Sequence, residues 1–110
     1  MENTLPPALQ TRIETLLAEH PVILFMKGLP ESPMCGFSAK AAAMLSHVGV
    51  PYHAVNILED EELRQGLKVF GDWPTYPQLY VKGELLGGAD IMGEMFQTGE
   101  LAEALQTAYA

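Results

Sequence analysis

The sequence predicts a single α/β domain over residues 1–110, in which a mixed four-stranded sheet carries helices on both faces. A length of 110 residues leaves room for one compact domain. The share of hydrophobic residues, 48%, is ordinary for a folded chain and too high for a disordered one. Helical and strand-like segments also alternate along the chain, and a strand–helix–strand unit requires a parallel pair joined by a right-handed crossover.

The first half of the chain is expected to form helix, strand, helix and strand in turn. A helix starts after Thr4, because the prolines that follow suit a first turn whose N–H groups have no partner, and it ends near residue 20. The continuous apolar run Val22–Met26 is typical of a central strand buried on both faces. Helix propensity resumes directly after Cys35 and ends near Gly49. Residues 52–57 indicate a second strand.

The second half of the chain predicts a helix, a hairpin and a terminal helical segment. Acidic residues at 59–62 open the helix, where the helix dipole favours carboxylates. Residues 78–81 and 85–87 flank a short turn and form a hairpin, which adds antiparallel strands to the sheet. The segment 90–110 is helical, with an interruption at 98–99. This order of elements is that of the thioredoxin fold.

Acidic residues outnumber basic ones by 14 to 6, and the net charge of −8 argues against nucleic-acid binding. No apolar run approaches the ~18–20 residues of a membrane span. The first residues lack the features of a signal or transit peptide, so we expect a cytoplasmic protein. Convergence of several cations on one pocket would indicate a small anionic ligand. The cations are Arg12, Lys27, Lys40, Arg64, Lys68 and Lys82.

Cys35 is the only cysteine, which excludes an intramolecular disulfide, a CxxC dithiol pair and a metal site built from several cysteines of one chain. It lies between a loop rich in proline and glycine and the start of a helix. Unpaired N–H groups at such a start lower a cysteine pKa from about 8.5 to roughly 3.5–7.5. Lys27, at the end of the preceding strand, is expected to add a cation nearby. A buried, unreactive thiol is the alternative interpretation.

Four short fragments resemble the monothiol glutaredoxins that carry a CGFS signature. The order of the fragments and their coverage of nearly the whole chain make the match specific. The chain looks like a single-domain glutaredoxin of the bacterial type. The fragments are residues 26–28, the signature itself at Cys35, Gly36, Phe37 and Ser38, residues 73–80 and residues 87–91.

The resemblance implies a glutathione site around a reactive thiolate at Cys35. Lys27 would pair with the glycyl carboxylate of glutathione and help to hold the thiolate, and Arg64 would contact the same carboxylate region. A surface ion pair of Arg64 with Asp60 is the alternative for that side chain, and both roles are compatible. Lys68, one helical turn further along, is a weaker candidate.

The resemblance also implies a cis proline at Pro77, which turns the backbone of Tyr76 toward the cysteinyl part of glutathione. Gly88 would let the backbone approach the ligand, while Ala89 and Asp90 would offer N–H groups and a carboxylate to the γ-glutamyl end. Asp90 serves equally well as a plain helix N-cap. The remaining residues expected beside the ligand are Gly36, Phe37 and Trp73.

Two functions are open to such a thiolate. Ser38 stands where dithiol glutaredoxins keep a resolving cysteine, so a reductase acting on protein–glutathione mixed disulfides would need glutathione as its second thiol. The resemblance implies instead a carrier that binds a [2Fe–2S] cluster and transfers it, and we prefer this function. A cluster usually needs four thiolates. Cys35 of two chains and two glutathiones would supply them in a symmetric dimer, with Cys35 as the metal ligand.

The partners expected for a carrier follow from the same resemblance. The chain would be a monomer without the cluster and a homodimer with it. Apo iron–sulfur proteins would accept the cluster, and a BolA-like protein could replace one of the two chains. A thioredoxin-like adaptor with an idle cysteine is a third, disfavoured interpretation.

Overall fold

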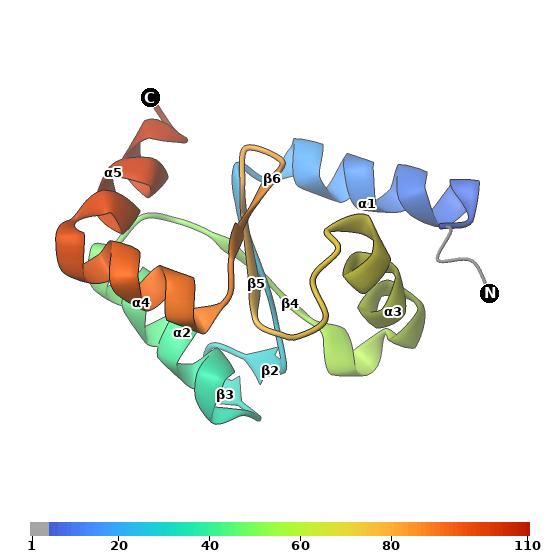
Figure 1. The fold of residues 1–110 in the computed structure, drawn as a ribbon, viewed down its shortest axis with the longest axis horizontal. Helices are drawn as coiled ribbons and strands as arrows, with labels where there is room; N and C mark the ends of the chain where they lie inside the picture. The colour runs from blue at the N-terminus through green and yellow to red at the C-terminus, as the bar shows by residue number, and fades with distance from the viewer. Residues whose placement is uncertain (1–4) are drawn as a thin grey trace.

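The computed structural model describes residues 5–110, with a four-stranded mixed sheet at its centre. Its strands are β1 (Val22–Met26), β4 (His53–Asn56), β5 (Gln78–Val81) and β6 (Glu84–Gly87). They lie in the order β4-β1-β5-β6. Strand β1 runs parallel to β4 and antiparallel to β5, and β5 forms the predicted hairpin with β6. The predicted fold class is therefore confirmed (Figure 1).

Strand β1 is buried along its whole length, as the continuous apolar run predicted. Neighbouring residues of a strand point to opposite faces of the sheet. Accordingly, Ile23 and Phe25 belong to one apolar cluster, while Val22, Leu24 and Met26 belong to the other. Packing on both faces fixes the end of β1, from which the loop toward Cys35 departs.

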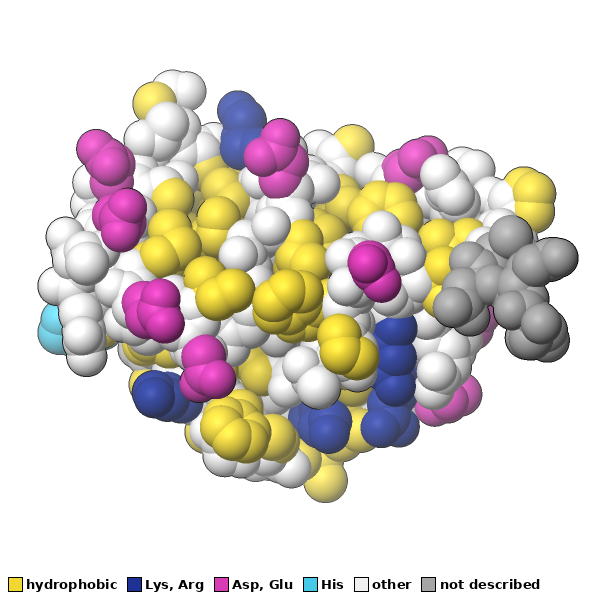
Figure 2. Space-filling model, in the orientation of Figure 1, with side chains coloured by type: hydrophobic (Ala, Val, Ile, Leu, Met, Phe, Trp, Pro, Cys, Tyr) yellow, Lys and Arg dark blue, Asp and Glu magenta, His cyan; other side chains and the backbone are white. Residues whose placement is uncertain are grey.

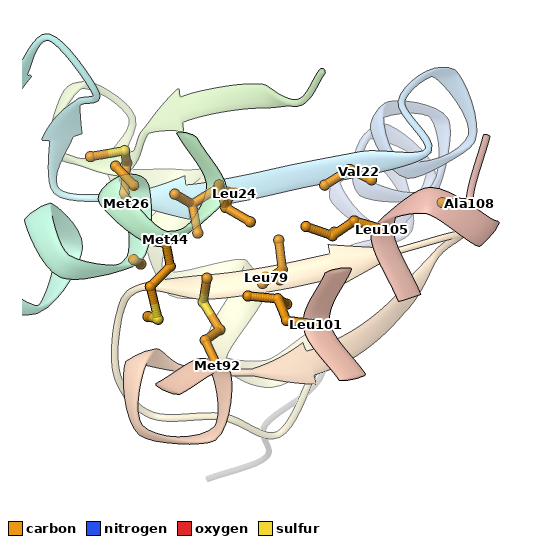
Figure 3. Packing of buried hydrophobic residues seen from close by; sticks show 12 residues of the cluster. Val22, Leu24, Met26, Met44, Leu79, Met92, Leu101, Leu105 and Ala108 are labelled. Carbon is orange, nitrogen blue, oxygen red and sulfur yellow. The ribbon is translucent and has the colours of Figure 1, made fainter. Parts of the chain in front are cut away.

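Helices cover both faces of the sheet (Figure 1). Those of the described residues are α1 (Pro7–Glu19), α2 (Gly36–Val48), α3 (Glu61–Phe70), α4 (Ala89–Thr98) and α5 (Glu100–Thr107). Helices α1 and α3 pack on one face, and α2, α4 and α5 pack on the other. Figure 3 shows the packing beneath α2, α4 and α5, with Met92 and Leu101 pointing toward Leu79 of β5. Between residues 5 and 110, none of these helices combines the length and apolar character needed to cross a bilayer.

Several boundaries differ from those expected. Helix α3 begins at Glu61 rather than at 59, because the Asp60 side chain caps it by accepting the Leu63 N–H (3.1 Å). Residues Ile57–Glu59 instead form a short 3₁₀ turn, η1, so strand β4 ends at Asn56. The expected helix start at Thr4 lies outside the described residues.

A small two-stranded ribbon occupies the loop between β1 and α2, where no regular structure was expected. It pairs β2 (Gly28–Leu29) with β3 (Ser32–Pro33). Two-residue strands leave no alternating pattern in a sequence, so the loop gave no signal for them. The ribbon leads directly into the segment that carries Cys35.

The surface pair of Arg64 with Asp60, which was the alternative interpretation of Arg64, does not form. The Arg12 guanidinium on α1 instead donates to the Asp60 carboxylate. This hydrogen bond holds the pKa of Asp60 below its usual value. The pair ties α1 to the start of α3, and thereby fixes the helix that carries Arg64 and Lys68.

Candidate functional site

Hydrogen bonds to α2 and to the end of β4 fix the start of the loop between β1 and α2. The Lys27 N–H donates to Ser38 Oγ (3.0 Å), and the Gly28 N–H donates to Asn56 Oδ1 (2.9 Å). Ser38 is completely buried, so its hydroxyl joins the end of β1 to the first turn of α2. These bonds hold Cys35 in a defined position beside the strand end.

Cys35 is the N-cap residue of α2 and is partly exposed. The pKa of Cys35 is lowered, above all by the Ser38 N–H. Desolvation raises the pKa and partly opposes this effect. The Phe37 N–H, the charge of Lys27 and the Ser38 hydroxyl lower the pKa further. The first N–H groups of α2 thus favour a thiolate at the position where an N-cap oxygen normally lies. This position favours the reactive thiolate over the buried, unreactive thiol.

Alkylation should therefore follow a pH profile shifted to the acid side. We expect the rate of Cys35 alkylation by iodoacetamide to reach half of its maximum at a lower pH in the folded protein than in urea, where the free-cysteine value of about 8.5 applies. Lys27→Gln should raise the folded midpoint only slightly, because the Ser38 N–H contributes more than the Lys27 charge. A folded midpoint at or above the unfolded one would contradict a stabilised thiolate.

The segment between α3 and β5 forms another wall of the site. Gln78 of β5 is completely buried, and its side-chain amide donates to the carbonyls of Trp73 (3.1 Å) and Thr75 (3.3 Å). The Tyr76 hydroxyl donates to the backbone carbonyl of Arg64 (2.7 Å). The segment is thus held to both the sheet and α3.

The junction of β6 and α4 meets this segment closely. The Tyr76–Pro77 peptide bond is cis, as the resemblance implied. A Cβ atom at Gly88 would lie 3.2 Å from the Pro77 carbonyl oxygen, so a side chain there would crowd the cleft. Gly88, rather than Asp90, is the N-cap residue of α4, which leaves the Asp90 carboxylate exposed in the first turn.

These segments enclose a cleft of about 480 Å³. It gathers all of the predicted site residues except Gly36, together with Lys68 and Trp73. Gly36 is the first residue of α2, and a Cβ there would meet nothing within 4 Å. The predicted residues that line the cleft are Lys27, Cys35, Phe37, Arg64, Tyr76, Pro77, Gly88, Ala89 and Asp90. The lining residues that sequence reasoning missed are Pro74, Thr75 and Ile91.

The cleft is cationic although the chain is strongly acidic. Lys27, Arg64 and Lys68 line it, while Asp90 is the one acid among its described lining residues. In Figure 2, basic side chains lie along the lower edge of the face shown, near α2, β2 and α3, with another at its upper edge, while acidic ones are spread more widely. In a chain of net charge −8, this convergence indicates a small anionic ligand.

Two buried donor atoms at the cleft have no hydrogen-bond partner among residues 5–110. They are Arg64 Nε and Trp73 Nε1. Buried polar atoms in folded proteins nearly always have a partner. A ligand with acceptor groups in the cleft fits both donors.

The described residues do not build a metal site of their own around Cys35. No group of three or more His, Cys, Asp or Glu side chains among them could hold a metal ion.

Comparison with known proteins gives concordant matches. A family model described as glutaredoxin matches residues 22–86. Monothiol glutaredoxin-4 of Schizosaccharomyces pombe is 53% identical over 94% of this chain and 42% of that protein. Probable monothiol glutaredoxin 2 of Rickettsia conorii is 51% identical over 86% of this chain and 88% of the relative. The solution structure of reduced poplar apo GrxS14 has a TM-score of 0.82 and 48% identity over 96% of both chains. The chain spans less than half of the length of several curated relatives.

Proposed function

The chain belongs to the glutaredoxin family, and on that premise we propose that it binds a [2Fe–2S] cluster together with glutathione and transfers the cluster to acceptor proteins. The observation that carries this proposal is the position of Cys35. The only thiol of the chain lies at a helix start, has a lowered pKa, and borders a cationic cleft.

The cleft fits glutathione group by group. Glutathione has two carboxylates, one ammonium group and one thiol. Lys27, Arg64 and Lys68 supply positive charge for the carboxylates, and Asp90 supplies a carboxylate for the ammonium group. The first N–H groups of α4 favour an anion as well. The unpartnered Arg64 Nε and Trp73 Nε1 atoms are donors that such acceptors would satisfy.

The number of thiolates requires two chains. A [2Fe–2S] cluster usually takes four thiolates, and each chain supplies one. Two chains and two bound glutathiones complete the set in a symmetric dimer. Met34 and Phe37, which flank Cys35, are exposed by 67% and 62%. A second chain placed against Cys35 would cover these apolar side chains, so they support association at this face.

Membership of the glutaredoxin family supports two further kinds of partner for a cluster carrier. Apo iron–sulfur proteins would accept the cluster, and a BolA-like protein could take the place of one chain. A cytoplasmic location likewise remains a prediction.

A monothiol reductase is the second candidate, and the lowered pKa of Cys35 favours it. The Cys35 thiolate would attack the glutathione sulfur of a protein–glutathione disulfide and release the protein thiolate. A glutathione thiolate would then attack the resulting Cys35–glutathione disulfide, which regenerates Cys35 and gives oxidised glutathione. Each cycle consumes one reduced glutathione: its sulfur is oxidised as the protein sulfur is reduced, and the glutathione of the substrate leaves in the disulfide.

Anaerobic reconstitution separates the two candidates. Protein supplied with ferric iron, sulfide and glutathione should become brown, and native mass spectrometry should show a dimer with two irons, two sulfides and two glutathiones. Without glutathione, the protein should stay monomeric and colourless. A colourless product with glutathione, or a cluster on a single chain, would refute the carrier. Turnover of a small glutathione mixed disulfide at the rate of a dithiol glutaredoxin would instead favour the reductase.

A further inference from the structure

Glu61 places a carboxylate beside one of the cations of the cleft. It lies in the first turn of α3, and its Oε1 atom is 3.7 Å from Nη1 of Arg64. Its other oxygen, Oε2, accepts a hydrogen bond from Nε2 of Gln65 (2.7 Å), which orients the carboxylate. Arg64 lines the cleft, whereas Glu61 stands outside it with 71% of its side chain exposed.

The contact between the two side chains is loose enough to exchange. A separation of 3.7 Å exceeds that of a hydrogen bond, so the attraction is mainly coulombic and screened by water. Arg64 Nε has no partner among residues 5–110. A guanidinium binds a carboxylate best through two parallel N–H groups, and Glu61 does not meet that geometry. A ligand carboxylate that did so would bind Arg64 more strongly than Glu61 does.

We propose that Glu61 is a built-in competitor for the anion site: its carboxylate lies beside Nη1 of Arg64 in the empty cleft, and its negative charge opposes a carboxylate of glutathione at the same guanidinium. This inference rests on the proposed binding of glutathione. It makes Glu61 a residue that sets affinity without touching the ligand. Its negative charge weakens binding, and its removal should strengthen binding.

Glu62 provides a matched control. It is the next residue of the same helical turn and is exposed by 68%, nearly as much as Glu61. Its Oε1 atom lies 3.6 Å from Nη1 of Arg12 on α1, and it is absent from the lining of the cleft. Glu61→Gln and Glu62→Gln therefore remove the same charge from the chain and from the start of α3, but only the first removes it from beside Arg64.

The test uses S-methylglutathione, which keeps both carboxylates but has no thiol to form a disulfide or to bind a cluster as a thiolate. Its Kd for the full chain is measured by NMR titration at fixed ionic strength. We expect E61Q to bind about two- to fivefold more tightly than the unchanged chain, the range typical of an exposed ion pair. E62Q should change the Kd by much less. In an Arg64→Gln background, E61Q should no longer tighten binding.

Two results would overturn the inference while leaving the proposed function intact. Either E61Q binds no more tightly than E62Q, or E61Q tightens binding equally with and without Arg64, which would indicate a general charge effect. If neither the unchanged chain nor E61Q binds S-methylglutathione, the proposed glutathione site fails and the competitor fails with it.

Discussion

Cys35→Ser is expected to abolish cluster binding completely. In the proposed dimer, two of the four thiolates come from Cys35 of the two chains, and no other cysteine can replace them. A serine hydroxyl does not ionise near neutral pH and is a poor ligand for a cluster that selects thiolates. After anaerobic reconstitution with glutathione, C35S should remain colourless, contain no bound iron, and run as a monomer in native mass spectrometry.

The same variant should keep its fold and its glutathione site, which makes the loss specific. Serine is a good N-cap residue, so the start of α2 remains capped. The charged residues of the cleft are unchanged, so C35S should still bind S-methylglutathione in the NMR titration. A dimer of C35S that retains two irons would contradict the role of Cys35 as the protein ligand.

The parts of the fold that could be predicted are those that depend on local sequence. The Val22–Met26 run has only apolar residues and forms a strand buried on both faces. Gly49 ends α2 in the left-handed conformation, as glycine at that position indicated. Interactions between distant segments could not be predicted. The hydrogen bond from Arg12 to Asp60 joins residues 48 positions apart, and no local pattern distinguishes it from an Arg64–Asp60 pair.

The site was predictable where chemistry requires a particular residue type. A lone thiol at a helix start pointed to Cys35 with Lys27 beside it, the family resemblance added Arg64, and the cleft gathers all three. The residues that position them were not predictable. Gln78 lies in an apolar strand and is buried with its amide bonded to two carbonyls. The polar side chain of Gln78 in an apolar run was the available signal that its amide is buried with hydrogen-bond partners. The position of Glu61 beside Arg64 depends on which side of α3 faces the cleft, so it was not predictable either.

Gly28→Ala is expected to lower the free energy of unfolding strongly, and by more than the matched substitution Gly49→Ala. Gly28 has a φ of +88°, a conformation that is unfavourable for any residue with a Cβ atom. The added Cβ would also lie 2.5 Å from the Ser32 carbonyl oxygen and 2.7 Å from the Met34 nitrogen. Both are backbone atoms, so no change of rotamer relieves the overlap. Backbone strain of roughly 1–2 kcal/mol plus this overlap should lower the free energy of unfolding by about 2–4 kcal/mol.

Gly49→Ala separates the two contributions. Gly49 has nearly the same φ, +82°, but a Cβ there would meet nothing within 4 Å. Urea unfolding should therefore show that G49A loses only the strain, roughly 1–2 kcal/mol, and that G28A loses clearly more. Gly28 lies in the ribbon that leads to Cys35, so G28A should also move the alkylation midpoint of Cys35 toward that of the unfolded chain, whereas G49A should not. Equal losses of stability in the two variants would mean that the ribbon yields to the added methyl group and does not hold the thiolate in place.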